Sequence, residues 1–189
     1  INGSAVISTG NVSGTNFNAT ANTITFAGSA PNLASTTANS DLLLSTNGVA
    51  GRVTFNGGGK IQQTAEKVTT EATAATGTVN YDVLTQAVWN FTTNASGNWT
   101  LNIRGNGSNS LNNIMDTGES ITVAHIVKQG GTAYYNSAVQ VDGSSVTPEW
   151  QGGAAPSAGN TNSLDVYSYT VIKTGDAAFT VLAAQTQFA

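Results

Sequence analysis

The sequence predicts an all-β protein, in which a short repetitive fibrous β segment precedes an antiparallel, jelly-roll-like β-sandwich. Charged residues make up only 8% of the chain, against roughly 25% in an ordinary soluble domain, and Gly, Ser, Thr, Asn and Ala take their place. Apolar and polar residues alternate clearly from Thr78 onward, with the period of half-buried strands. Turn sequences such as Asp142-Gly143 separate these alternating runs.

The chain divides into three segments. Residues 1–60 hold short apolar patches separated by turn residues, and residues 6–14 are weakly echoed by residues 43–51. Because this segment has few large apolar residues to bury alone, we expect it to pack against copies of itself in a homotrimer. Residues 61–76 are predicted to be a linker or an extended strand, since their threonines disfavour a helix, and residues 77–189 to form the sandwich.

The clearest predicted strand of the sandwich contains Trp99, Leu101 and Ile103, which alternate with polar residues and should share one buried face. The only histidine, His125, occupies an apolar position of the alternating run 121–127. We therefore expect His125 to be a structural residue of the core or of a contact between chains. A catalytic or metal-binding role is not expected for it.

Composition excludes several classes of function. The chain has no cysteine, so it forms neither disulfides nor thiolate metal sites. Six Lys and Arg residues in a chain of net charge −4 are too few to neutralise a run of phosphates, so nucleic acid is not an expected partner. No apolar run approaches the roughly 20 residues of a membrane helix, so no membrane insertion is expected. The chain begins at Ile1 without a signal segment, and we expect it to be part of a longer polypeptide.

No motif for catalysis, for a cofactor or for a metal ion stands out, and we expect neither an enzyme nor a bound cofactor. Asp142-Gly143 indicates a hairpin turn, because the further acidic positions of a calcium-binding loop are absent. The ten carboxylates are scattered along the chain, and their spacing nominates no pair for glycoside cleavage.

Aromatic residues in loops are the candidates for binding. Trp150 lies in the Gly-rich stretch 148–162, and Tyr134 and Tyr135 follow a Gly-Gly pair. Aromatic rings stack on sugars, while Asn and Gln side chains bond sugar hydroxyls. Glycan contact at these three residues is our binding hypothesis, although anchoring its loop to the sandwich is the simpler role for Trp150. The stretch 106–118 is a second candidate binding loop.

Residues 89–105 read WNFTTNASGNWTLNIRG, residues 150–153 read WQGG and residues 179–188 read FTVLAAQTQF. With these strings, the stretch 76–189 resembles the C-terminal module of marine cyanobacterial phage structural proteins, of the tail-fibre-like or virion-appendage kind. The resemblance implies a homotrimer on the virion surface, whose partners are its own copies and other virion proteins. It brings no catalytic motif, so no functional residue is transferred by it.

We therefore expect a structural fibre or appendage module of a phage, displayed on the particle and contacting host surface polysaccharide. Three alternatives remain: a capsid decoration or head-fibre protein, a polysaccharide-degrading enzyme like a tailspike, and a bacterial surface adhesin. The position on the virion would distinguish the first alternative, and activity on host glycans would test the second.

Overall fold

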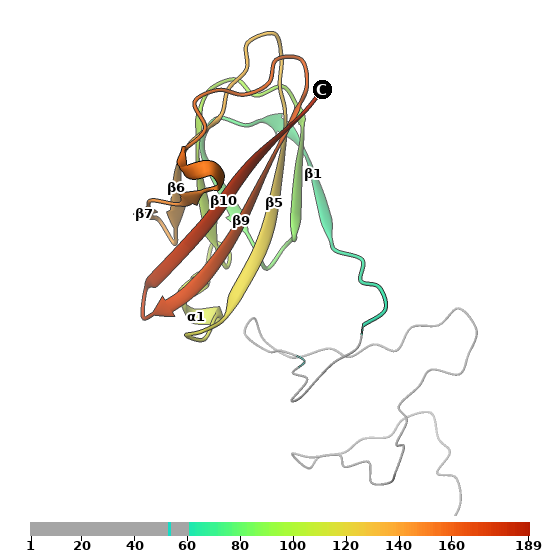
Figure 1. Cartoon of the computed structure of the whole chain (residues 1–189). Coiled ribbons are helices and arrows are strands. Elements are labelled where there is room, and N and C mark those ends of the chain that lie inside the picture. The colour runs from blue at the N-terminus through green and yellow to red at the C-terminus, as the bar shows by residue number, and fades with distance from the viewer. Residues whose placement is uncertain (1–52, 54–60) are drawn as a thin grey trace, which may run out of the picture. The chain divides into compact units, whose positions relative to one another are not determined.

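The computed structural model describes residue 53 and residues 61–189, which contain two β-sheets (Figure 1). Apart from residue 53, the predicted repetitive segment 1–60 lies outside the described residues. The strands are β1 (Val68–Ala74), β2 (Gly77–Asp82), β3 (Val88–Thr93), β4 (Trp99–Arg104), β5 (Ser120–Lys128), β6 (Asn136–Val141), β7 (Ser144–Val146), β8 (Glu149–Trp150), β9 (Leu164–Gly175) and β10 (Ala178–Phe188). The other elements of this part are one helical turn, α1 (Leu111–Ile114), and one 3-10 turn, η1 (Gln151–Gly153). The predicted all-β class is confirmed.

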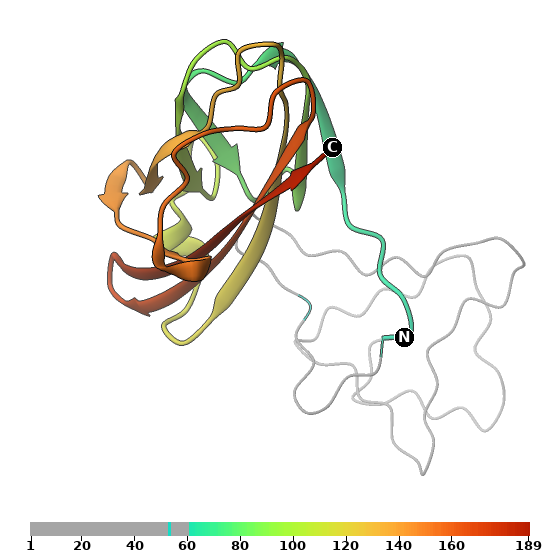
Figure 2. The same cartoon turned by 45° about the horizontal axis from the view of Figure 1, so that its top comes forward.

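The first six strands alternate between the two sheets. β1, β3 and β5 are neighbours in the six-stranded sheet, and β2, β4 and β6 are neighbours in the four-stranded sheet. Within each sheet these strands are parallel. The chain between residues 68 and 141 therefore winds as a flat coil, with one strand in each sheet per turn (Figure 2).

Antiparallel strands complete both sheets. β9 and β10 form a hairpin, β9 also pairs with β5, and β7 turns back on β6. The short β8 pairs in parallel with β10 at the edge of the larger sheet.

The prediction of an antiparallel sandwich was wrong for most strands, because five of the eight pairings are parallel, and the jelly-roll-like order is not confirmed. Alternation of apolar residues shows which face of a strand is buried, but it does not show the direction of the neighbouring strand. Parallel neighbours need a crossover connection, which is usually a helix. In this coil a strand of the opposite sheet makes that crossover.

The six-stranded sheet begins inside the segment predicted as a linker or an extended strand. β1 covers residues 68–74 and pairs with β3, whereas residues 61–67 contain no helix or strand. The extended-strand interpretation therefore holds for β1. Its threonines, which argued against a helix, favour a strand because a β-branched side chain packs well on a pleated surface.

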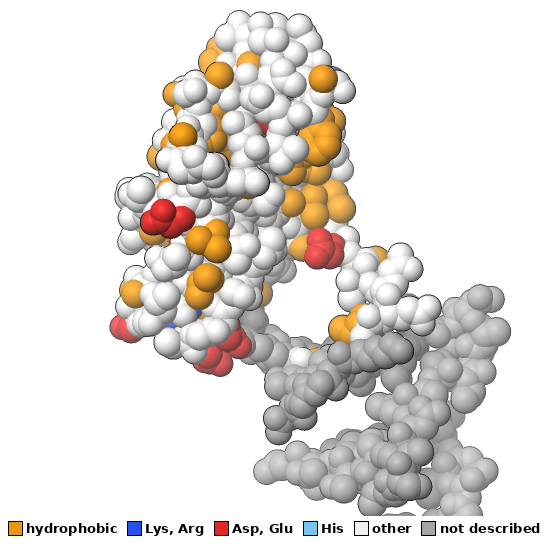
Figure 3. Space-filling model, in the orientation of Figure 1, with side chains coloured by type: hydrophobic (Ala, Val, Ile, Leu, Met, Phe, Trp, Pro, Cys, Tyr) orange, Lys and Arg blue, Asp and Glu red, His pale blue; other side chains and the backbone are white. Residues whose placement is uncertain are grey.

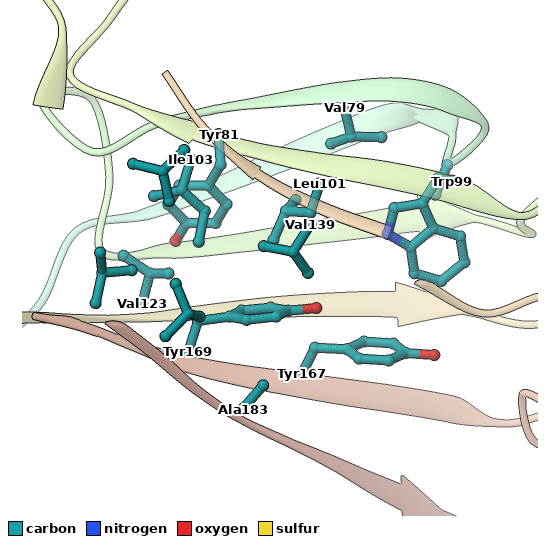
Figure 4. Packing of buried hydrophobic residues seen from close by; sticks show 14 of the residues in the cluster. Val79, Tyr81, Trp99, Leu101, Ile103, Val123, Val139, Tyr167, Tyr169 and Ala183 are labelled. Carbon is teal, nitrogen blue, oxygen red and sulfur yellow. The ribbon is translucent and has the colours of Figure 1, made fainter. Parts of the chain in front are cut away.

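The core lies between the two sheets and follows from the alternation within each strand (Figure 4). Trp99, Leu101 and Ile103 of β4 are all buried, as predicted. Tyr167 and Tyr169 of β9 lie across from them in the facing sheet and are also fully buried. Large rings of this kind dominate the apolar area that a small core can bury.

Candidate functional site

Trp150 lies in β8 at the edge of the six-stranded sheet, and not in a loop as the sequence suggested. It pairs with Ala183 of β10, whose side chain is buried between the sheets. Paired residues in neighbouring strands point to the same face, so the indole ring also points inward. The ring is half-buried and meets Tyr169 edge to face, with 6.1 Å between ring centroids. This contact anchors β8 to the sandwich, which is the simpler of the two predicted roles.

Trp150 also borders a surface hollow of about 310 Å³. Gln151, Pro156 and Gln185 line the same hollow. The amide of Gln185 donates hydrogen bonds to the Tyr167 hydroxyl (2.9 Å) and to a backbone carbonyl, so its position is fixed. An aromatic residue beside amide groups is suited to hydroxyl-bearing ligands, but glycan contact at Trp150 stays a prediction.

Tyr134 and Tyr135 lie between β5 and β6 and are held through their backbones. The Tyr134 N–H donates to the Gln129 Oε1 (2.9 Å), and the Gln129 Nε2 donates to the Tyr134 carbonyl (2.9 Å). The Tyr135 N–H donates to the Asn98 Oδ1 (3.1 Å). Among the described residues, no ring contact joins either tyrosine to Trp150. The three predicted glycan contacts therefore do not form one platform, and contact at each tyrosine remains a separate prediction.

A buried carboxylate lies behind this loop. Asp165 has no exposed surface, and its Oδ2 accepts hydrogen bonds from the Gln129 Nε2 (3.0 Å) and the Asn160 N–H (3.1 Å). Its Oδ1 has no partner. Burial raises the pKa of Asp165, although these hydrogen bonds oppose the shift. The side chain connects the loop before β6 to the loop before β9, and its charged form is poorly compensated because one oxygen has no partner.

His125 lies at the centre of the core, as its alternating run predicted. It is fully buried, and neither ring nitrogen has a hydrogen-bond partner. Aromatic rings surround it, with centroids 5.0 to 6.5 Å away, namely Tyr81, Trp89, Phe91, Trp99 and Tyr167. Burial lowers the pKa of His125 from 6.5 to about 3, so the ring is neutral at pH 7. The predicted core position is confirmed, and the absence of a catalytic role stays a prediction.

The remaining charged groups of the described residues are dispersed. Over residue 53 and residues 61–189, no group of three or more His, Cys, Asp or Glu side chains is arranged to hold a metal ion. In the same part of the chain, no helix combines the length and hydropathy needed to cross a membrane. Arg104 donates from its Nε to the Asp82 Oδ1 (2.6 Å) in a half-exposed ion pair across two parallel strands.

A further hollow, of about 560 Å³, was not predicted from the sequence. It lies beside the first residues of β5, because β3 begins only at Val88, opposite Ala124. The Ala124 N–H donates to the Ala87 carbonyl, so the backbone groups of Ala124 point toward β3. Every second residue of a strand directs its N–H and C=O to the same side. The N–H and C=O of Thr122 therefore point into the hollow. The walls are mostly apolar, and the side chain of Gln86 is 5% exposed. The open edge of β5 ahead of Ala124 follows from the strand register, and no local sequence pattern indicates it.

Comparison with protein-family models, with curated proteins and with solved structures finds no match for this chain. By its fold, the described part of the chain is a two-sheet β protein with a parallel coil and an antiparallel hairpin.

Proposed function

We propose that this chain is a non-enzymatic structural module of a phage virion, and that three copies form a fibre or appendage displayed on the particle. The resemblance of residues 76–189 to appendage modules of marine cyanobacterial phages supports the virion assignment. Attachment to host surface polysaccharide is the adhesive part of the proposal, in which Trp150, Tyr134 and Tyr135 are the first candidate contacts.

The parallel coil is the observation that carries the proposal. Within the described residues, its first turn is formed by β1 and β2, and each of these strands is the edge of its sheet. The neighbour of each edge strand is parallel to it, so the described part of the coil presents two edge strands that accept a further turn of the same kind. Architectures that grow by stacking turns suit elongated appendages, because each turn contacts only its neighbours.

Self-association is supported by the outer face of the six-stranded sheet. Val181 and Ala183 of β10 are buried, so Leu182 between them points outward and is 45% exposed. Four large apolar side chains of this sheet are 42% to 54% exposed: Val68, Leu164, Leu182 and Phe188. The face drawn in Figure 3 is mostly uncharged, with hydrophobic side chains scattered over it and few acidic ones. Little desolvation of charge would therefore oppose contact between copies.

Light scattering on the full chain tests the trimer. A mass three times the 19.2 kDa of one chain is expected at micromolar concentration. Leu182→Glu should dissociate the trimer without unfolding it, because a carboxylate would enter the contact between copies. Leu84→Glu is the matched control, since Leu84 is 42% exposed but lies in the connection between β2 and β3 and not on a strand of this sheet. A folded monomer for the unmodified chain would contradict the trimer.

Labelling with antibodies against the chain tests the virion assignment. Labelled fibres or appendages on intact particles are expected. Label on the capsid shell would indicate the decoration-protein alternative, and particles without label would contradict a virion protein. Cleavage of host polysaccharide by the purified chain would contradict the non-enzymatic part of the proposal.

A further inference from the structure

A polar hollow of about 390 Å³ lies at the end of β4, on the outer side of the four-stranded sheet. Its walls are Arg104, the loop 106–110 and the turn Asp142-Gly143, together with Asn102. Each lining residue is either polar or glycine. The hollow thus differs from the apolar one beside β5, and it includes the start of the stretch 106–118 that the sequence singled out as a binding loop.

The loop is held in one conformation by the Asn106 side chain. Its Oδ1 accepts hydrogen bonds from the Ser108 N–H (2.8 Å), the Asn109 N–H (2.8 Å) and the Asn109 Nδ2 (3.1 Å). The amide oxygen is therefore fully used, and the Nδ2 of Asn106 keeps its two hydrogens for other partners. A Cβ at Gly105 would lie 2.4 Å from the Asn109 carbonyl oxygen, so the loop packs directly on this glycine. A preordered loop loses little conformational entropy when a ligand binds.

The opposite wall is equally fixed. The Asp142 N–H donates to the Ile103 carbonyl (3.0 Å), which ties the turn to the end of β4. The two carboxylate oxygens of Asp142 accept the N–H groups of Leu111 (2.6 Å) and Asn112 (2.9 Å). Each oxygen still has a lone pair, so the carboxylate can accept a further hydrogen bond.

Arg104 supplies donors to the hollow, and its charge is already paired. Its Nε donates to Asp82, which leaves the outer guanidinium nitrogens free in the described structure. A Cβ at Gly107 would lie 3.8 Å from the Arg104 Nη2, so this nitrogen faces the loop. With Arg104 neutralised by Asp82 and with Asp142 in the wall, the site carries no excess positive charge. An anion would therefore gain little from it.

We propose that this hollow binds a neutral, hydroxyl-rich ligand, namely a hexose unit of a surface polysaccharide. Sugar hydroxyls both donate and accept hydrogen bonds, and the wall offers guanidinium and amide donors opposite a carboxylate acceptor. The inference rests on the proposed attachment to host glycans and names the site and the class of sugar. No aromatic ring lines the hollow, so each site should bind weakly, and three copies in one trimer would raise the avidity.

The test is a titration of the full chain followed by amide chemical shifts in NMR spectra. The probes are D-galactose and D-glucose at millimolar concentration, with D-glucuronate and inorganic phosphate as anionic probes. A neutral sugar should shift the amides of the loop 106–110 and of Gly143 in a saturable manner. Shifts caused only by the anions would overturn the neutral class, and an absence of saturable shifts here would overturn the site.

A variant that fills the hollow makes the test specific. Gly107→Leu adds a side chain whose Cβ meets only the Arg104 Nη2, at ordinary contact distance, and should weaken sugar binding at least about ten-fold. Gly131→Leu is the matched control, because a Cβ at this exposed glycine meets only the Asn162 Oδ1, at 4.0 Å. Equal affinity in the two variants would contradict the site. The trimer mass and the particle labelling do not depend on these substitutions, so failure here leaves the virion assignment standing.

Discussion

Acidification should destabilise the sandwich through His125. The imidazole is fully buried among aromatic rings, and its two nitrogens have no hydrogen-bond partner. A proton on this ring would place an unpaired charge in the core. The folded protein therefore takes up that proton only near pH 3, whereas the unfolded chain takes it up near pH 6.5.

The magnitude follows from these two pKa values. Because the pKa of His125 is lower in the folded state, its contribution to stability is fully present above pH 6.5 and is lost as the pH falls from 6.5 toward 3. Each pH unit in this window lowers the free energy of unfolding by about 1.4 kcal/mol. The protein should thus be roughly 3 kcal/mol less stable at pH 4 than at pH 7 through this residue alone.

Urea denaturation at pH 7 and pH 4 measures this effect, with His125→Phe as the matched variant. Phenylalanine keeps a flat ring and cannot be protonated, and the chain has no other histidine. The variant should lose about 3 kcal/mol less than the unmodified protein between the two pH values, since the carboxylates are common to both and cancel. Equal losses in the two proteins would refute the reasoning. His125→Gln should instead be less stable than His125→Phe at both pH values, because the glutamine amide would be buried without hydrogen-bond partners.

Three further predictions concern stability and hydrogen exchange. Asp165→Asn should raise the free energy of unfolding at pH 7 by about 1 kcal/mol, because it removes a buried charge with an unpartnered oxygen. Since the pKa of Asp165 is raised in the folded state, that gain should vanish below pH 3.8, and a gain that persisted there would contradict the explanation. Trp150→Ala should lower the free energy of unfolding by about 2 kcal/mol, because its ring packs on Tyr169, whereas unchanged stability with weakened glycan attachment would favour the binding role. The Thr122 N–H should exchange with deuterium at least about ten-fold faster than the Val123 N–H, and equal protection would show that the open edge of β5 is covered.

The faces of the strands could be predicted from the sequence, because burial leaves a period of two. Trp99, Leu101 and Ile103 alternate with polar residues, and all three are buried. The same rule placed His125 in the core, although it gave no sign that the ring would lack hydrogen bonds. Burial is a property of each residue on its own strand, so it can be read without knowing the neighbours.

Strand direction and the polar hollow depend on residues far apart in the sequence, and no local pattern predicts them. Gly143 donates its N–H to the Asn102 Oδ1 (2.8 Å), a contact between positions 41 residues apart. The sequence marked the loop that starts at Asn106 as a binding candidate, but the turn that completes the hollow was interpreted only as a hairpin. Likewise, Trp150 lies between Pro148 and the pair Gly152-Gly153, which suggested a loop, yet pairing with β10 places it in an edge strand.

The parallel coil gives a physical reason for the low content of charged residues. A need for solubility does not explain it. Parallel strands in register place paired positions of successive turns about 4.8 Å apart, so that their side chains lie side by side. Asn80, Asn102 and Gln140 form such a row on the outer face of the four-stranded sheet, and the Asn102 Nδ2 donates to the Asn80 Oδ1 at 2.8 Å. Like charges in this row would repel at every step, whereas neutral amides bond to one another. Where charges do occur in the neighbouring row, they are opposite, in the pair of Asp82 and Arg104. A composition rich in Thr, Asn and Ser is therefore a condition for stacking these turns, and the same condition would apply to any further turn added at the open edges of β1 and β2.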